Sequence, residues 1–147
     1  MFKTIVWATD GSEHADRALP LVTGLARAHR SKIVAVHVDE LLAGRLGGAS
    51  LLADDPEIVQ KIERQVGELR DGGYTVEFQL IRGVDGLASM IARAARKADA
   101  QLIVVGTHGH GGLAAALLGS VARGLLHEAD CPVLAVPPSE VRELALA

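Results

Sequence analysis

The chain has 147 residues, of which 49% are hydrophobic and 22% charged, and its formal net charge is −3. This length and balance predict one globular domain with a substantial core, and they exclude a disordered chain. An acidic chain with 3% aromatic residues lacks the basic surface and stacking platforms of nucleic-acid-binding proteins, so we expect no nucleic acid partner. No apolar run approaches the roughly 20 residues that span a bilayer and no signal segment precedes the first strand, so we expect a cytoplasmic protein without a membrane partner.

The N-terminal part of the chain predicts a strand, a helix and a second strand. Residues 4–8 form a β-branched and aromatic run, and Asp10-Gly11-Ser12 ends it with turn residues that also open a helix. Apolar residues at three- and four-residue spacing predict a helix over residues 13–29, in which Pro20 should cause a kink or a later start because it lacks an amide hydrogen. Residues 32–38 are almost continuously apolar, as in a parallel strand that is covered on both faces.

The middle of the chain predicts a loop, a helix and a strand. Residues 40–53 show no period, so we expect a long, mobile loop of the kind that often forms a functional lid. Asp54-Asp55-Pro56 is typical of a helix start, and Gly72-Gly73 of the end of that helix. Residues 74–81 alternate between apolar and polar side chains, which places this strand nearest an edge of the sheet.

The C-terminal part predicts two more strand and helix pairs. Asp85 is expected to cap a helix that closes near Asp99. The single cysteine, Cys131, is expected as a small residue in or near the core rather than as a redox thiol. The remaining elements are a strand over residues 102–105, a helix over residues 120–129 and a strand over residues 133–136, which Pro137-Pro138 stops.

Strand and helix patterns therefore alternate along the whole chain. Right-handed crossovers favour an α/β fold with an open five-stranded parallel sheet, helices on both faces and the flavodoxin/Rossmann-like strand order 3-2-1-4-5. In this order the first and fourth strands are neighbours at the point where the winding reverses, and a ligand crevice opens there. Asp10 and Gly106 would face the same crevice. We expect a single domain over residues 1–138 and a C-terminal tail over residues 139–147.

A glycine-rich segment follows the strand at residues 102–105. Glycines at positions 106, 109, 111 and 112 allow the backbone to present successive amide groups, and Gly119-Ser120 stands where the next helix opens. Amides in a concave turn and the N-terminal end of a helix both favour an anion, so the segment suits a phosphate. The alternative to a phosphate site is an ordinary tight turn, in which Ser120 acts only as a helix cap.

The spacing Gly106, two residues, Gly109, nine residues, Gly119-Ser120 resembles the nucleotide-binding pattern of the universal stress protein family. Residues 4–12 are similar to the family's opening strand and turn, residues 36–38 to its second strand, and residues 131–136 to its last strand. The resemblance covers nearly the whole chain. It implies ATP, with Mg²⁺, at the ends of the first and fourth strands, and a homodimer through the last strand.

The same resemblance implies which residues form the site. The carboxylate of Asp10 would lie near the adenine or ribose, the main chain of Val38 against the adenine, and the glycines and Ser120 around the phosphates. An aspartate that only caps a helix remains the alternative for Asp10, and a core valine for Val38. The full set is Thr9, Asp10, Gly11, Val38, Gly106, Thr107, His108, Gly109, His110, Gly119, Ser120 and Val121.

The chain departs from the family pattern at two positions. After Gly109 many members carry a basic residue, whereas this chain has His110, which is mostly neutral at pH 7. Phosphate affinity should therefore be weaker and depend on pH. The family often has a proline after Gly83, and its absence concerns the start of the next helix.

Several other chemistries are excluded by pattern. His108 and His110 lack a third metal ligand at a recognisable spacing, and the chain has neither a P-loop motif nor the acidic pair, aspartate and lysine of a receiver domain. No residue that would orient an attacking water can be named. The favoured function is an ATP-holding regulatory protein of the stress response. The alternatives are a slow ATPase or autophosphorylating enzyme, and a nucleotide-free dimeric interaction module.

Overall fold

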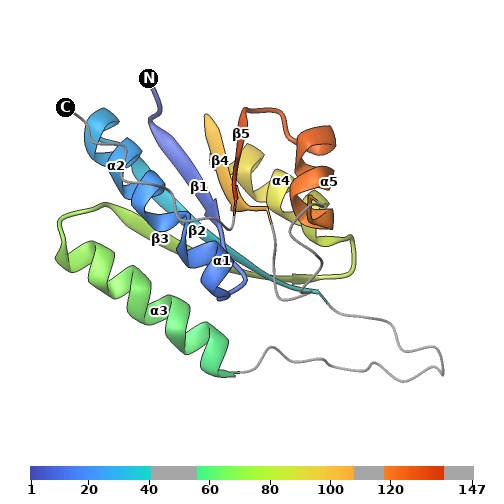
Figure 1. The fold of residues 1–147 in the computed structure, drawn as a ribbon, viewed down its shortest axis with the longest axis horizontal. Helices are drawn as coiled ribbons and strands as arrows, with labels where there is room; N and C mark the ends of the chain where they lie inside the picture. Colours follow the sequence, from blue (N-terminus) through green and yellow to red (C-terminus); the bar gives the residue numbers. More distant parts are fainter. Residues whose placement is uncertain (41–55, 108–117, 138–147) are drawn as a thin grey trace.

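The computed structural model describes residues 1–40, 56–107 and 118–137 (Figure 1). In these ranges strands alternate with helical segments as predicted, except that two helices rather than one stand between the first two strands. The elements in chain order are β1 (Thr4–Ala8), α1 (Glu13–Asp16), α2 (Leu19–His29), β2 (Lys32–Glu40), α3 (Pro56–Asp71), β3 (Val76–Gly83), α4 (Leu87–Lys97), β4 (Leu102–Gly106), α5 (Ser120–Glu128) and β5 (Val133–Val136).

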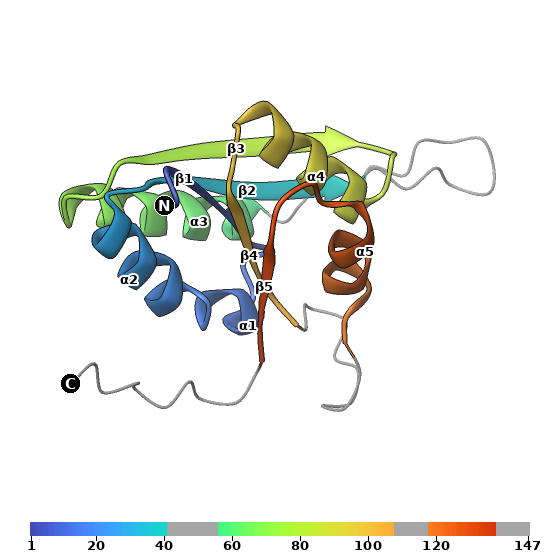
Figure 2. The ribbon, with the colours of Figure 1, turned by 90° about the horizontal axis from the view of Figure 1, so that it is seen from above.

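The sheet is fully parallel and has the order β3-β2-β1-β4-β5, which confirms the predicted topology. The first and fourth strands are neighbours, and β3 lies at an edge as its alternating pattern predicts. Helices α2 and α3 cover one face, and α4 and α5 cover the other (Figures 1 and 2). Figure 2 shows how strongly the sheet twists between β3 and β5.

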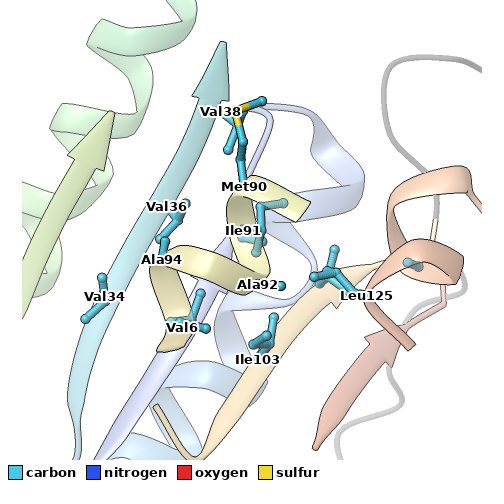
Figure 3. Close-up of a cluster of buried hydrophobic side chains, with 14 residues drawn as sticks. Val6, Val34, Val36, Val38, Met90, Ile91, Ala92, Ala94, Ile103 and Leu125 are labelled. Carbon is cyan, nitrogen blue, oxygen red and sulfur yellow. The ribbon is translucent and has the colours of Figure 1, made fainter. Parts of the chain in front are cut away.

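The central strands are buried on both faces, so each contributes alternate residues to two cores. Val6, Val34, Val36 and Ile103 point toward α4 and α5, where they meet Met90, Ile91 and Leu125 (Figure 3). The intervening residues, Ile5, Trp7, Ile33 and Val104, pack against α2 and α3. This period of two is the reason that the strands read as continuous apolar runs in the sequence.

The single helix predicted over residues 13–29 is wrong. The structure has two helices, and α1 ends at Asp16, with Arg17 as its C-cap. Helix α2 then begins at Leu19, with Pro20 in its first turn, where a missing amide hydrogen costs nothing. Of the two outcomes expected from Pro20, the later helix start is confirmed.

Two smaller predictions need correction, and a third falls almost entirely outside the described residues. Strand β3 begins at Val76 rather than at residue 74, because the Tyr74 amide donates to the Leu69 carbonyl at the end of α3 (3.1 Å). The cap of α4 is Gly86, with φ 87° and no side-chain hydrogen bond, whereas Asp85 accepts a hydrogen bond from Arg93 (3.2 Å). The predicted loop over residues 40–53 falls outside the described residues except for Glu40, which ends β2.

Candidate functional site

The carboxyl ends of β1 and β4 form the centre of the candidate site. In the β1–β4 register Ala8 pairs with Val105, so Thr9 and Gly106 follow side by side. Adjacent strands lie about 4.8 Å apart, which brings the two segments into direct proximity. The structure therefore confirms that the segments containing Asp10 and Gly106 emerge together, at the reversal point of the winding.

A compact turn connects β1 to α1. The Thr9 hydroxyl accepts the Gly11 amide (3.1 Å), and the Asp10 carboxylate accepts the Ser12 amide (2.9 Å). The cap of α1 is Ser12, whose hydroxyl accepts the Ala15 amide (3.3 Å), so Asp10 is not the capping residue. Gly11 has φ 76°, a conformation that favours glycine. Short polar side chains thus fix the backbone of this turn.

Helix α3 holds the same turn from the side. The Lys61 ammonium donates to the Gly11 carbonyl (2.7 Å) and to the Asp16 carboxylate (2.6 Å), and the Gln65 amide donates to the other Asp16 oxygen (2.8 Å). A Cβ atom added to Gly11 would lie 2.7 Å from the Ile58 side chain. Sequence reasoning missed these α3 residues, because no local pattern signals a contact between a turn and a helix this distant in the chain.

Strand β2 extends past the end of β1. The Val36 carbonyl accepts the Thr9 amide (2.9 Å), and β2 then continues to Glu40, where it pairs with β3 alone. Val38 lies two residues beyond Val36, so its main-chain groups point to the same side, over the end of β1. The Val38 side chain is buried in the core beneath α4. Val38 is therefore a core residue through its side chain, and its main-chain groups face the space beyond the end of β1.

Two polar residues of β2 are buried beside the turn. The ring nitrogen Nδ1 of His37 lies 2.8 Å from the Thr9 carbonyl, which can only accept, so Nδ1 carries the hydrogen. Asp39 is 4% exposed, and Arg82 of β3 lies 3.4 Å from its carboxylate. Burying polar groups is unfavourable unless they are hydrogen-bonded. Here His37 has a hydrogen-bond partner and Asp39 an oppositely charged one.

The β4 side of the site joins three elements at one residue. The Thr107 amide donates to the Val136 carbonyl of β5 (2.9 Å), and its carbonyl accepts the Gly119 amide (2.6 Å). Gly119 is the N-cap of α5 and makes no side-chain capping hydrogen bond. Ser120 is the first residue of the helix rather than its cap, and Val121 packs against the core. The opening of α5 is therefore anchored directly beside the end of β4.

The structure thus brings most of the predicted site residues to one end of the sheet. His108, Gly109 and His110 lie outside the described residues. On the β1–β2 side stand Thr9, Asp10, Gly11 and Val38, and on the β4–α5 side Gly106, Thr107, Gly119, Ser120 and Val121.

Other functional groups in the described parts of the chain are few. Cys131 packs partly buried against the core, and burial, reinforced by the charge of Asp130, raises the pKa of its thiol. Within residues 1–40, 56–107 and 118–137, no group of three or more His, Cys, Asp or Glu side chains could hold a metal ion. None of the helices in those ranges has the length and hydropathy of a membrane span.

Comparison with known proteins agrees with the fold. A sequence model of the universal stress protein family matches residues 1–137. A universal stress protein of Thermus aquaticus is 36% identical over 139 residues, which cover 92% of this chain and 99% of that protein. The solved structure of Methanocaldococcus jannaschii MJ0577 has a TM-score of 0.76 at 26% identity, with 92% of this chain and 96% of that chain covered.

A second solved structure carries a ligand. The universal stress protein from Archaeoglobus fulgidus in complex with dAMP has a TM-score of 0.68 at 27% identity, with 92% of this chain and 97% of that chain covered. The family match, the sheet order and the glycine spacing all point to the same family. This protein belongs to the universal stress protein family.

Proposed function

We propose that this protein is an ATP-binding regulatory protein of the universal stress type, which holds ATP with Mg²⁺ across the carboxyl ends of β1 and β4. The observation that carries the proposal is the placement of the Asp10 turn, on an adjacent strand, beside the start of α5, whose N-cap Gly119 has no side chain to cap the helix. One side offers a carboxylate and the other a helix N-terminus. A nucleotide has a nucleoside whose hydroxyls can donate to the carboxylate, and an anionic phosphate chain that suits the helix N-terminus.

The adenosine part would bind on the β1–β2 side. There the main chain of Val38 points over the end of β1 and can form hydrogen bonds with the edge of a base. Asp10 would accept hydrogen bonds from the ribose hydroxyls, because an ionised carboxylate is an acceptor only. The turn is already ordered by its own hydrogen bonds, so little conformational freedom would be lost on binding.

The phosphates would bind on the β4–α5 side. The first amides of a helix have no partners within the helix and carry its positive dipole end, which favours an anion. Gly119 makes no side-chain cap that would compete for them, and the exposed Ser120 adds a hydroxyl donor. The Archaeoglobus fulgidus relative in complex with dAMP supports an adenine nucleotide as the ligand class.

A homodimer through β5 is part of the proposal. Strand β5 is the second edge of the sheet, and its Val133, Leu134 and Ala135 are only partly buried. An edge strand with apolar side chains is a pairing surface, and a two-fold axis would bring two copies together there. Light scattering after size-exclusion chromatography at micromolar concentration should give the mass of two chains, and a monomer would contradict this pairing.

The binding test begins with the freshly purified protein. It is denatured, and any released nucleotide is identified by chromatography; the emptied protein is then titrated with ATP and Mg²⁺ by calorimetry. We expect ATP to be released or to bind, and we expect Gly119→Val to weaken binding about a hundredfold, equivalent to about 2.8 kcal/mol. Gly119 has φ −59°, which valine adopts without strain, so the fold should persist while the branched side chain blocks the phosphates.

The matched control is Gly24→Val. It makes the same chemical change on α2, where an added Cβ meets no atom within 4 Å, and it should leave ATP affinity unchanged. Equal affinity in Gly119→Val and the wild type would remove the phosphate assignment. Neither released nucleotide nor heat with the wild type would overturn the ATP proposal as a whole and favour the interaction module. Steady release of ADP would instead favour the slow ATPase.

A further inference from the structure

We propose that Lys61 is a positioning residue that sets the orientation of Asp10 for nucleotide binding, an inference that rests on the proposed function. Lys61 lies on α3, far from the glycine pattern in the sequence, and does not belong to the predicted site. Its ammonium donates to the Gly11 carbonyl, in the peptide group that joins Gly11 to Ser12. The consequence for Asp10 comes from the other end of that peptide group.

A single peptide unit connects the two residues. The Gly11 carbonyl accepts from Lys61 (2.7 Å), while the amide of the next residue, Ser12, donates to the Asp10 carboxylate (2.9 Å). Because the peptide is planar, its carbonyl and amide point in opposite directions and rotate together. Rotating this unit would break both hydrogen bonds. Lys61 therefore fixes the amide that holds the Asp10 side chain.

The local backbone needs such a restraint. Gly11, at φ 76°, is a residue whose conformational freedom allows the peptide to adopt other orientations. A cation on the carbonyl also polarises the peptide and strengthens the donation from its amide to the Asp10 carboxylate. The Lys61 contact thus acts on the orientation and on the strength of the Asp10 hydrogen bond.

Helix α3 is built to support Lys61 in this position. Asp16 accepts from Lys61 and Gln65, which lie one turn apart on the same side of α3. Ile58, one turn earlier, packs on Gly11. The Lys61 and Asp16 side chains are 33% and 29% exposed, and ion pairs this accessible to solvent add little to stability. We therefore expect loss of Lys61 to affect ligand binding more than folding.

The test uses Lys61→Met and Lys61→Arg. Lys61→Met should weaken the binding of ATP and of adenosine by about the same factor, roughly tenfold, because Asp10 serves the nucleoside rather than the phosphates. Lys61→Arg should lose less affinity for both ligands, since arginine keeps the positive charge and the hydrogen-bond donors but not the compact ammonium group. The matched control is Lys32→Met, which removes a lysine ion pair with Glu77 at the opposite end of the strands. It should leave both affinities unchanged.

A double-mutant cycle with Asp10→Ala separates positioning from a general loss of stability. If Lys61 acts through Asp10, Lys61→Met should have little further effect on adenosine affinity in the Asp10→Ala background. Additive losses, or a selective loss for ATP with adenosine unaffected, would overturn the proposal. So would unchanged affinity in Lys61→Met.

Hydrogen exchange at the Ser12 amide distinguishes failure of this inference from failure of the proposed function. Lys61→Met should speed exchange at Ser12 in the absence of ligand, whereas Lys32→Met should not. If the wild type binds no nucleotide but exchange speeds up, the restraint on the turn stands and the proposed function falls. If the wild type binds ATP but exchange is unchanged, the Lys61 proposal falls and the proposed function stands.

Discussion

The two ends of the sheet use polar groups in different ways. At the amino end, the Gln101 side chain accepts the Lys3 and Thr4 amides (both 2.8 Å), and Lys32 pairs with Glu77 (2.5 Å) with both side chains nearly half exposed. At the carboxyl end, Thr9, His37 and Asp39 are almost fully buried. At the amino end one buried hydroxyl, that of Ser31, donates to the Phe2 carbonyl, and the ion pair is solvated. At the carboxyl end the buried polar groups gather beside the β1 turn, where each has a polar partner.

Gly11→Ala should give the largest effect and is the sharpest test of this difference. Alanine at φ 76° is strained, and its Cβ would lie 2.7 Å from the Ile58 side chain. We expect a loss of about 2–3 kcal/mol in the free energy of unfolding, measured by urea denaturation, together with loss of nucleotide binding.

The double variant Gly11→Ala/Ile58→Ala separates the two causes. It removes the steric conflict but keeps the strained φ, and Ile58→Ala alone supplies the baseline. If Gly11→Ala lowers the free energy of unfolding as much on the Ile58→Ala background as in the wild type, the steric conflict with Ile58 of α3 contributes nothing to this loss of stability.

Gln101→Ala is the intermediate case and should separate stability from binding. Two backbone amides at the start of β1 would lose their acceptor, which we expect to lower the free energy of unfolding by about 1–2 kcal/mol. ATP affinity measured by calorimetry should not change, because the proposed site lies at the other end of the strands. Gln101→Glu keeps an acceptor for both amides and should lose less stability. A drop in ATP affinity with Gln101→Ala would contradict the inference that the amino end of the sheet affects stability but not binding.

The smallest effect concerns Glu77 and pH. The hydrogen bond from Lys32, reinforced by Gln79, lowers the pKa of Glu77 below its ordinary value of 4.5. A carboxyl with a lowered pKa stabilises the fold above its unfolded value, and this contribution is lost as the pH falls through the folded value. The wild type should therefore exceed Lys32→Met in stability by less than about 1 kcal/mol at pH 7, because the pair is exposed.

The measurement for Glu77 is thermal unfolding of both proteins between neutral pH and pH 3. The two stability curves should run parallel near neutral pH and converge as the pH falls below 4.5, where the carboxyl is mostly protonated in the unfolded state and then becomes protonated in the folded state as well. A difference that grows as the pH falls would have the wrong sign for this ion pair.

The sheet could be predicted from sequence because each central strand is a local apolar run and parallel strands leave few topologies. Right-handed crossovers and a doubly wound strand order then predict β3-β2-β1-β4-β5, which brings Thr9 and Gly106 together. Helix ends were less predictable. The apolar stripe continues across Arg17 and Ala18, so periodicity could not show that α1 and α2 are separate helices.

The support of the site could not be predicted, because it depends on contacts between distant segments. Asp85 and Asp10 both precede a helix, yet one pairs with an arginine and the other with a backbone amide. Lys61 has the sequence signature of an ordinary surface lysine on an amphipathic helix. Only the packing of α3 against the β1 turn distinguishes it.

The extension of β2 past the end of β1 bears on how this chain can change over evolution. Beyond Thr9, what β2 presents toward β1 is backbone, and the Val38 side chain belongs to the core. Exchanging Val38 for another β-branched residue keeps both the strand and its exposed peptide groups. Position 38 can therefore vary among β-branched residues while its main chain keeps the place that the proposed nucleotide site requires, and a motif defined by side-chain identity would overlook it.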